Sequence, residues 1–323
     1  MPTTASSIVP FAPPSLGPEE IAEVVATLES GWLTTGPRVA SFERRFADYV
    51  GAPHALAVNS CTAALHLSLL ASGVKTGDEV VTTPLTFCAT ANVIVHAAGT
   101  PVFADIDPVS CNLDPGAVEA ALTDRTKVIL PVHYAGRPAD MDAFVAIARA
   151  AGLRIVEDAA HCVEGAIDGK RVGSIGDFTC FSFYATKNLT TGEGGMVTTA
   201  DEQAASFMRT ASLHGMSRDG WTRYAPGGSP HYDVVTAGFK YNMMDLQAAI
   251  GLHQLARIDI MHARHLDEHS LPRGAPAPVL PGALRFPSRH VPGCRIRFRH
   301  HAVTAAVRGD DRDRGRSGHR GLS

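Results

Sequence analysis

The first clear hydrophobic pattern along the chain is that of an amphipathic helix. In residues 18–30 apolar residues recur every three or four positions, and Gly31 follows as a stop signal. A second amphipathic helix is predicted over residues 39–50, ended by Gly51. The preceding segment, 1–17, is rich in proline and serine, and we expect it to be extended.

After this point short β-branched or apolar runs alternate with helical stretches. The predicted strands are 55–58, 80–83, 101–106, 128–133, 155–157, 178–184 and 196–199. The predicted helices are 62–71, 86–98, 115–122, 141–151, 201–213 and 242–265. Such alternation is typical of βαβ units, so the sequence predicts an α/β fold with a mostly parallel sheet covered by helices on both faces. In such sheets, ligands bind at the carboxyl ends of the strands.

The last segment, 266–323, differs in kind. It is rich in arginine, proline and glycine, contains no lysine, and keeps no helical or strand period. We expect a poorly ordered basic tail; an out-of-frame or truncated C-terminus would give the same shift in composition. A nucleic-acid-binding arm is disfavoured because aromatic interleaving and a folded scaffold are missing. Without a domain to cover it, the helix face through Leu246, Ile250 and Leu255 is expected to be exposed or only poorly covered.

Composition narrows the class of protein. The 323 residues are 45% hydrophobic and 19% charged, enough for a substantial core, and the net charge of -3 gives no general attraction to nucleic acid or membrane. The six cysteines form no CxxC pair and most lie in apolar runs, which favours reduced, buried thiols over disulfides or a zinc site. The chain shows no signal-peptide pattern and no apolar run of membrane-spanning length, so we predict a cytoplasmic protein.

Lys187 is the first candidate for chemistry. It follows the apolar run 178–184 and precedes a glycine-rich loop. A lysine in this position would be partly desolvated, which lowers its pKa and frees the amine as a nucleophile. The alternative is an ordinary surface lysine in a loop.

Three further patterns lie where predicted strands end. The run 59–62 precedes a helix whose free first-turn amides could bind an anion, although an ordinary helix cap has the same sequence. Asp158 ends a strand, with His161 three residues on, so both could meet one ligand; a structural aspartate beside a core histidine is the alternative. Phe87 could stack on a flat ring or pack in the core. No HExxH spacing is present, which disfavours a zinc site.

Together these candidates supply what pyridoxal phosphate requires. Its aldehyde needs an amine, its phosphate needs amide donors, its pyridinium needs a carboxylate, and its ring needs a stacking face. Neither a GxxxxGK[ST] loop nor a GxGxxG turn after the first strand offers a competing phosphate site.

Motifs spread over residues 18–265 then point to one family. The runs that carry the resemblance are GWLTTGPRVASFERRFADYVGA, NSCTAALHLSL, GDEVVTTPLTFCATANVI, PVFADIDP, VEDAAHCVEGA, FSFYATKNLTTGEGGMV and GFKYNMMDLQAAIGL. In this order they resemble the DegT/DnrJ/EryC1/StrS family, the pyridoxal-phosphate-dependent sugar aminotransferases of fold type I. The resemblance implies a seven-stranded-type sheet and an active site shared across a homodimer.

The resemblance also implies roles for single residues. Lys187 matches the Schiff-base lysine, Asp158 the partner of the pyridine nitrogen, His161 the residue near the ring hydroxyl, and Phe87 the stacking aromatic. The positions that match phosphate contacts are Cys61, Thr62, Ser182 and, from the neighbouring subunit, Asn242.

The same resemblance implies a domain plan. A large cofactor-binding domain spans 18–241, and a connecting helix spans 242–265. Family members continue with a small α/β domain that closes over the site, and the tail 266–323 does not resemble it, so we expect that domain to be degraded. The segment HGMSRDGW, starting at His214, matches a loop that borders the sugar-nucleotide pocket.

The implied reaction transfers an amino group, with glutamate as the expected donor, to a keto group of a nucleotide-linked sugar. It would serve amino-sugar biosynthesis for a polysaccharide or a glycosylated metabolite. Lys187 would act as general base and acid. A related sugar dehydratase is disfavoured, because those related to the 3-dehydratases carry histidine in place of this lysine. A non-catalytic protein that binds pyridoxal phosphate, or a regulatory one, is the alternative that the altered C-terminus leaves open.

Overall fold

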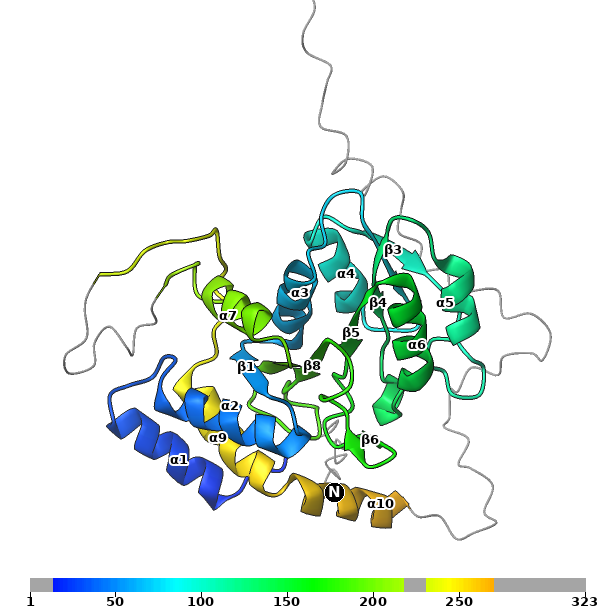
Figure 1. Cartoon of the computed structure of the whole chain (residues 1–323). Coiled ribbons are helices and arrows are strands. Elements are labelled where there is room, and N and C mark those ends of the chain that lie inside the picture. Colours follow the sequence, from blue (N-terminus) through cyan, green and yellow to red (C-terminus); the bar gives the residue numbers. More distant parts are fainter. Residues whose placement is uncertain (1–13, 218–230, 270–323) are drawn as a thin grey trace, which may run out of the picture. The chain divides into compact units, whose positions relative to one another are not determined.

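A seven-stranded sheet forms the centre of the fold (Figure 1). The computed structural model describes residues 14–217 and 231–269. The strands of the sheet are β1 (His54–Val58), β2 (Glu79–Thr82), β3 (Thr100–Phe103), β4 (Thr126–Leu130), β5 (Arg154–Asp158), β8 (Phe178–Ser182) and β9 (Gly195–Thr199). They lie in the order β1-β9-β8-β5-β4-β2-β3.

Five neighbouring strands of the sheet run parallel, and one strand runs against its neighbours. The pairs β2–β3, β2–β4, β4–β5 and β5–β8 are parallel. Strand β9 is antiparallel to both β1 and β8. The prediction of a mostly parallel seven-stranded sheet is therefore confirmed.

Helices cover both faces of this sheet. One face carries α3 (Cys61–Ala71), α4 (Cys88–His96) and α7 (Glu202–Ala211). The other carries α2 (Pro37–Val50) and α9 (Asp245–Ala256) over one half, and α5 (Pro115–Ala121) and α6 (Met141–Ala151) over the other. Side chains of β4 alternate between the two faces: Val128 and Leu130 pack with α3 and α4, and Ile129 packs with α5 and α6.

The predicted helix over 242–265 is in fact two helices, so that prediction is wrong in this respect. Helix α9 ends at Ala256, and α10 (Ile258–His269) begins after Arg257, whose φ of -116° and ψ of 8° leave the helical region. The Arg257 guanidinium donates to the Ser15 carbonyl at 2.8 Å and pairs with Glu20. These contacts lie where the helix is interrupted. The sequence has neither proline nor glycine at this position, so it gave no sign of the interruption.

The expectation that this face of α9 lacks cover is wrong for Leu255, whereas Leu246 and Ile250 are half-buried. Helix α1 (Pro18–Glu29) and α2 pack against α9 (Figure 1), and Leu255 is only 8% exposed. The Gln254 side chain donates to Glu20 of α1 at 2.8 Å and helps to hold the two helices together. Helix α1 itself exposes apolar side chains at Ile21, Val25 and Leu28.

A short hairpin was not predicted. Strands β6 (Ala166–Ile167) and β7 (Lys170–Arg171) pair antiparallel around Asp168 and Gly169. Both turn residues have positive φ, 48° and 79°, as a tight hairpin turn requires. The Asp-Gly dipeptide is a recognised signal for this turn and could have revealed the hairpin.

Several predictions fall on parts of the chain outside the described residues. Most of the extended segment 1–17, the HGMSRDGW run after Ser217, and the tail from residue 270 onward are among them. The domain boundaries at 17, 241 and 265 stay predictions. Within the described ranges, no helix is long and apolar enough to cross a membrane.

The cysteine prediction agrees with the structure in part. The five cysteines within the described ranges are free. Cys61, Cys162 and Cys180 are buried, whereas Cys88 is exposed and Cys111 is half-buried. The described part of the chain gathers no group of three side chains that could hold a metal ion.

A buried polar pair ties the middle of the sheet together. His133 Nε2 lies 2.9 Å from Glu157 Oε2, and both side chains are fully buried. The Ala139 amide donates to His133 Nδ1, so Nε2 carries the proton and donates to Glu157. The other oxygen of Glu157 accepts the Gly176 amide and the Thr179 hydroxyl at 2.9 and 2.6 Å. Glu157 thus satisfies three donors: buried His133, buried Thr179 and the half-buried Gly176 amide.

We expect Glu157→Ala to lower the free energy of unfolding by about 3–5 kcal/mol, because three donors, two of them buried, lose their acceptor. Urea denaturation of the full chain measures the change. Glu119→Ala, which truncates an exposed carboxylate on α5, is the control and should leave the midpoint near that of the parent. Equal midpoints for the two variants would contradict this account.

Candidate active site

Lys187 lies in a turn directly after β8. Its backbone amide donates to the Tyr184 carbonyl at 2.9 Å, and its side chain is half-buried. Burial lowers the pKa of the amine, and the neighbouring Cys61 and Asp158 oppose this shift only in part. The desolvated lysine that the sequence predicts is therefore present.

The start of α3 carries a side-chain cap, and two of its first-turn amides take no part in that cap. The Ser60 hydroxyl accepts the Ala63 amide at 3.1 Å, so the cap interpretation is correct for Ser60. The Ser60 carbonyl accepts the Ala64 amide. This arrangement leaves the first two amides of the helix, at Cys61 and Thr62, for an anion.

Glycine at position 195 lets β9 approach this helix start. A Cβ at Gly195 would lie 2.5 Å from the Ser60 carbonyl carbon and 2.6 Å from the Cys61 amide nitrogen. Such contacts are too short for any side chain, so only glycine fits. The close approach brings the GEGG run beside the predicted phosphate site.

Asp158 ends β5 at the carboxyl edge of the sheet and is 5% exposed. Its Oδ1 accepts the Ala160 amide at 3.1 Å, and its Oδ2 accepts the Thr90 hydroxyl at 2.8 Å. A turn follows Asp158 and carries His161. Burial and the nearby Lys187 charge lower the pKa of His161, which favours the neutral ring.

Phe87 caps the N-terminus of α4 and is 77% exposed. A core phenylalanine would be buried, so the structure excludes that interpretation. The ring is available to stack on a ligand.

One cavity of about 660 Å³ collects these groups. Seven of the eight predicted site residues line it: Cys61, Thr62, Phe87, Asp158, His161, Ser182 and Lys187. A cavity of this size suits a small cofactor and part of its substrate. Amide donors, a carboxylate, an amine and an exposed aromatic ring in one cavity fit a phosphorylated aromatic aldehyde.

Asn242 is the predicted residue that does not line this cavity. Its Nδ2 donates to the Thr35 hydroxyl at 2.8 Å, and its Oδ1 accepts the Lys240 ammonium at 2.7 Å. The predicted contact with the phosphate of a neighbouring subunit stays a prediction.

The cavity is also lined by residues that the sequence analysis did not single out. Tyr184 and Glu193 are two of them. Tyr184 belongs to the FSFYATK run and Glu193 to the GEGG run, so each lies within a few residues of a recognised motif. Their nearness to Lys187 in sequence is the signal that could have found them.

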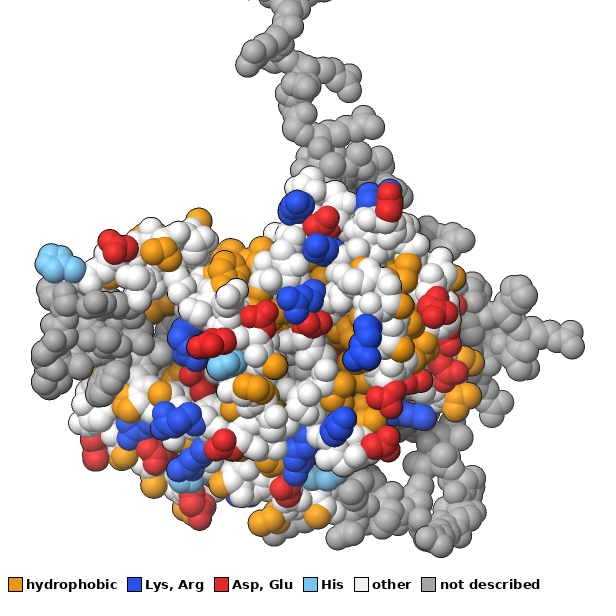
Figure 2. Space-filling model, in the orientation of Figure 1, with side chains coloured by type: hydrophobic (Ala, Val, Ile, Leu, Met, Phe, Trp, Pro, Cys, Tyr) orange, Lys and Arg blue, Asp and Glu red, His pale blue; other side chains and the backbone are white. Residues whose placement is uncertain are grey.

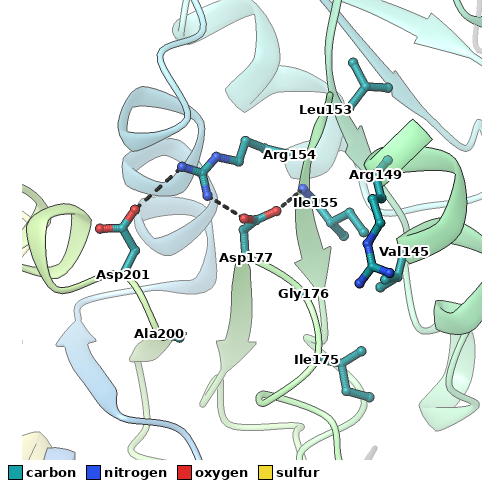
Figure 3. Close-up of a pocket in the computed structure, with 11 residues that line it drawn as sticks. Val145, Arg149, Leu153, Arg154, Ile155, Ile175, Gly176, Asp177, Ala200 and Asp201 are labelled. Atoms are coloured by element: carbon teal, nitrogen blue, oxygen red, sulfur yellow. Dashed lines mark hydrogen bonds and ion pairs between the residues drawn. The ribbon is translucent and has the colours of Figure 1, made fainter. Parts of the chain in front are cut away.

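A second cavity, of about 460 Å³, lies at the opposite ends of the strands (Figure 3). Arg154, which begins β5, donates to Asp177 at 2.5 Å and lies 3.7 Å from Asp201. The other Asp177 oxygen accepts the Ile155 amide at 2.8 Å. Arg154 is thus paired with Asp177 and Asp201. No lysine, histidine or cysteine lines this cavity, so we do not take it as the candidate active site.

The face of the molecule in Figure 2 shows no large patch of only basic or only acidic side chains. Basic and acidic side chains are interspersed over the described part of that face. This distribution agrees with the small net charge of -3.

A family model described as the DegT/DnrJ/EryC1/StrS aminotransferase family matches residues 14–272. This chain belongs to that family. The resemblance inferred from the motifs is thereby confirmed, and so is the prediction of a pyridoxal-phosphate-dependent aminotransferase at the level of the family.

Two relatives in this family are closely similar in sequence. The spore coat polysaccharide biosynthesis protein SpsC of Bacillus subtilis is 58% identical over 79% of this chain and 66% of its own length. The uncharacterized protein MJ1066 of Methanocaldococcus jannaschii is 53% identical over 80% of this chain and 67% of its own length. The chain spans about two thirds of the length of both relatives.

A solved structure from the same family supports the fold and the cofactor. The putative sugar aminotransferase Spr1654 of Streptococcus pneumoniae, in its PMP form, has a TM-score of 0.75 and 39% identity. The match covers 80% of this chain and 70% of that one. Its PLP form matches with a TM-score of 0.74. The predictions of fold type I and of pyridoxal phosphate as cofactor are confirmed.

Because burial lowers its pKa, Lys187 of the apo protein should react with a small acylating reagent at a lower pH than an ordinary lysine does. The reactive species is the neutral amine, and a lower pKa places more of it at a given pH. Competitive acetylation with peptide mass spectrometry measures this, with exposed Lys75 as the internal reference. Identical pH profiles for the two lysines would contradict the desolvation argument.

Proposed function

We propose that this chain transfers an amino group from L-glutamate to a keto group of a nucleotide-linked sugar, with pyridoxal 5′-phosphate as cofactor. The observation that carries the proposal is that Lys187, Asp158 and the start of α3 line one cavity. The relative named for spore coat polysaccharide biosynthesis and the neighbour described as a sugar aminotransferase support a sugar acceptor in amino-sugar or polysaccharide biosynthesis.

The start of α3 binds the cofactor's phosphate in this proposal. The amides of Cys61 and Thr62 point out of the helix, and its dipole favours an anion there. The Thr62 and Ser182 hydroxyls, which belong to residues that line the same cavity, add donors. The Cys61 thiol stays neutral, because burial and the Asp158 charge raise its pKa well above the ordinary value.

Phe87 and Asp158, which ends β5, are the residues that would hold the cofactor ring. Phe87 would supply a stacking face, the Asp158 carboxylate would accept a hydrogen bond from the protonated ring nitrogen, and neutral His161 would lie near the ring hydroxyl. Bound pyridoxal phosphate supplies an electron sink for negative charge at the substrate carbon. Asp158 keeps the ring nitrogen protonated and so maintains that capacity.

Lys187 is the general base and acid in this proposal. Its Nζ accepts a proton from Cα of the amino donor and later returns one to the acceptor carbon. Burial lowers the pKa of this amine, so a larger fraction is unprotonated near neutral pH than in an exposed lysine.

A second copy of the chain completes the site in this proposal. Asn242 lies outside the cavity of its own chain, and its side chain is held in place by Thr35 and Lys240. Leu33 and Met244, each 41% exposed, lie beside this hydrogen-bonded segment and offer apolar contacts. A homodimer would bring Asn242 to the phosphate site of its partner.

Incubation with glutamate and a panel of keto-sugar nucleotides tests the function. We expect 2-oxoglutarate to form in step with a product in which an amine has replaced the ketone, measured by mass spectrometry. Aspartate and glutamine as donors define the donor preference. A protein that binds pyridoxal phosphate but responds to no donor would instead support the binding-only alternative.

A further inference from the structure

A threonine outside the cavity lining holds the carboxylate of Asp158. The Thr90 hydroxyl donates to Asp158 Oδ2 at 2.8 Å. Thr90 is fully buried and Asp158 is 5% exposed, so water does not compete for this bond. The two residues are 68 positions apart in the chain.

A second threonine, Thr86, donates a hydrogen bond to Thr90. Thr86 Oγ1 lies 2.6 Å from Thr90 Oγ1. A carboxylate accepts and does not donate, so the single hydroxyl proton of Thr90 goes to Asp158. Thr86 must then donate to Thr90. The result is a one-way chain from Thr86 through Thr90 to Asp158.

The other carboxylate oxygen of Asp158 and its backbone are also hydrogen-bonded. Its Oδ1 accepts the Ala160 amide at 3.1 Å. Its backbone amide donates to the Pro131 carbonyl and its carbonyl accepts the His133 amide, at 2.9 and 3.0 Å. One protein donor therefore occupies each carboxylate oxygen, and the lone pairs that remain are left for a ligand in the cavity.

Helix α4 links this contact to the stacking face. Phe87 is the N-cap of α4, and the Thr90 amide donates to the Phe87 carbonyl at 3.1 Å. The first turn of one helix thus presents the exposed ring and anchors the carboxylate. A movement of this turn would disturb both groups together.

We propose that Thr90 is a positioning residue: it fixes the Asp158 carboxylate as an oriented acceptor for the cofactor's ring nitrogen, with Thr86 as the donor behind it. This inference rests on the proposed function, in which Asp158 serves that nitrogen. A hydrogen bond donated to a carboxylate favours its charged form. With the cofactor bound, this hydrogen bond would help to keep the proton on the ring nitrogen.

The test compares Thr90→Val, which keeps the shape and removes the hydroxyl, with Thr90→Ser, which restores it. Thr198→Val is the matched control, since Thr198 is 1% exposed and its hydroxyl donates to the Gly173 carbonyl at 2.8 Å. Each protein is loaded with pyridoxal phosphate labelled with ¹⁵N in the ring. The ¹⁵N chemical shift reports protonation of that nitrogen, and titration of the apo protein gives the dissociation constant of the cofactor.

We expect Thr90→Val to bind the cofactor while its ¹⁵N signal moves toward that of unprotonated pyridine. The half-reaction with glutamate should slow by about 10- to 100-fold, the value of one hydrogen bond to a charged group. Thr90→Ser and Thr198→Val should keep the parental ¹⁵N signal. If Thr90→Val fails to fold, Thr86→Val replaces it and should move the signal in the same direction by a smaller amount.

A parental ¹⁵N signal in Thr90→Val, or an equal shift in Thr198→Val, would overturn the positioning role. Failure of the proposed function looks different. In that case the parent itself would not bind pyridoxal phosphate or would show an unprotonated ring nitrogen. The parent and the variant therefore separate the two hypotheses.

Discussion

Lys187→Ala is expected to abolish amino transfer while leaving pyridoxal phosphate bound without a covalent bond. The amides at the start of α3, the Phe87 face and Asp158 are unchanged in this variant, so the non-covalent contacts remain. The amine that attacks the aldehyde and carries the proton is gone. Because a positioned acid–base group alone contributes about 10²- to 10⁴-fold, and the covalent step is lost as well, we expect turnover to fall by more than about a thousandfold.

Two measurements check the Lys187 assignment. Borohydride reduction of the parent followed by peptide mass spectrometry should place the cofactor on the Lys187 peptide, and the variant should show none. Spectroscopic titration should show that the variant still binds the cofactor. Lys75→Ala removes an exposed lysine and should behave as the parent. More than a trace of transaminase activity in Lys187→Ala would refute the assignment.

Asp158→Asn should bind pyridoxal phosphate and lose most of the rate. The amide has the shape of the carboxylate, and its oxygen can still accept the Thr90 hydroxyl. It carries no charge, however, and cannot keep a proton on the ring nitrogen. Loss of one preorganised electrostatic group in an active site typically costs about 10²- to 10³-fold, and we expect a loss of that order.

The half-reaction with glutamate, followed by stopped-flow absorbance, measures this effect without any sugar acceptor. Asp142→Asn neutralises an exposed carboxylate on α6 and is the control. If Asp158→Asn ran the half-reaction at the parental rate, Asp158 would not be the partner of the ring nitrogen.

The layers of the fold could be predicted from the sequence because their causes are local. Apolar residues repeat every second position in strands and every three to four in helices, and turn residues separate them. In β4, for example, Val128, Ile129 and Leu130 are all apolar, which is typical of a strand buried on both faces, and the structure packs them alternately to the two sides.

Most of the candidate site could be predicted for a related reason. Parallel strands place their carboxyl ends at one edge, so residues that follow different strands converge there. Lys187, Asp158, Phe87 and the start of α3 each follow a strand, and all line the same cavity. The sequence left open whether Phe87 is buried; its 77% exposure decides the point.

By itself, then, the sequence determined the family, the order of the main elements and seven of the residues around the cavity. Only the tertiary structure decided that α9 is covered by α1, that the helix breaks at Arg257, and that Thr90 holds Asp158. The reason is physical. Arg257 meets Glu20 and Thr90 meets Asp158 across long stretches of chain, and such contacts leave no mark in the local periodicity of either partner.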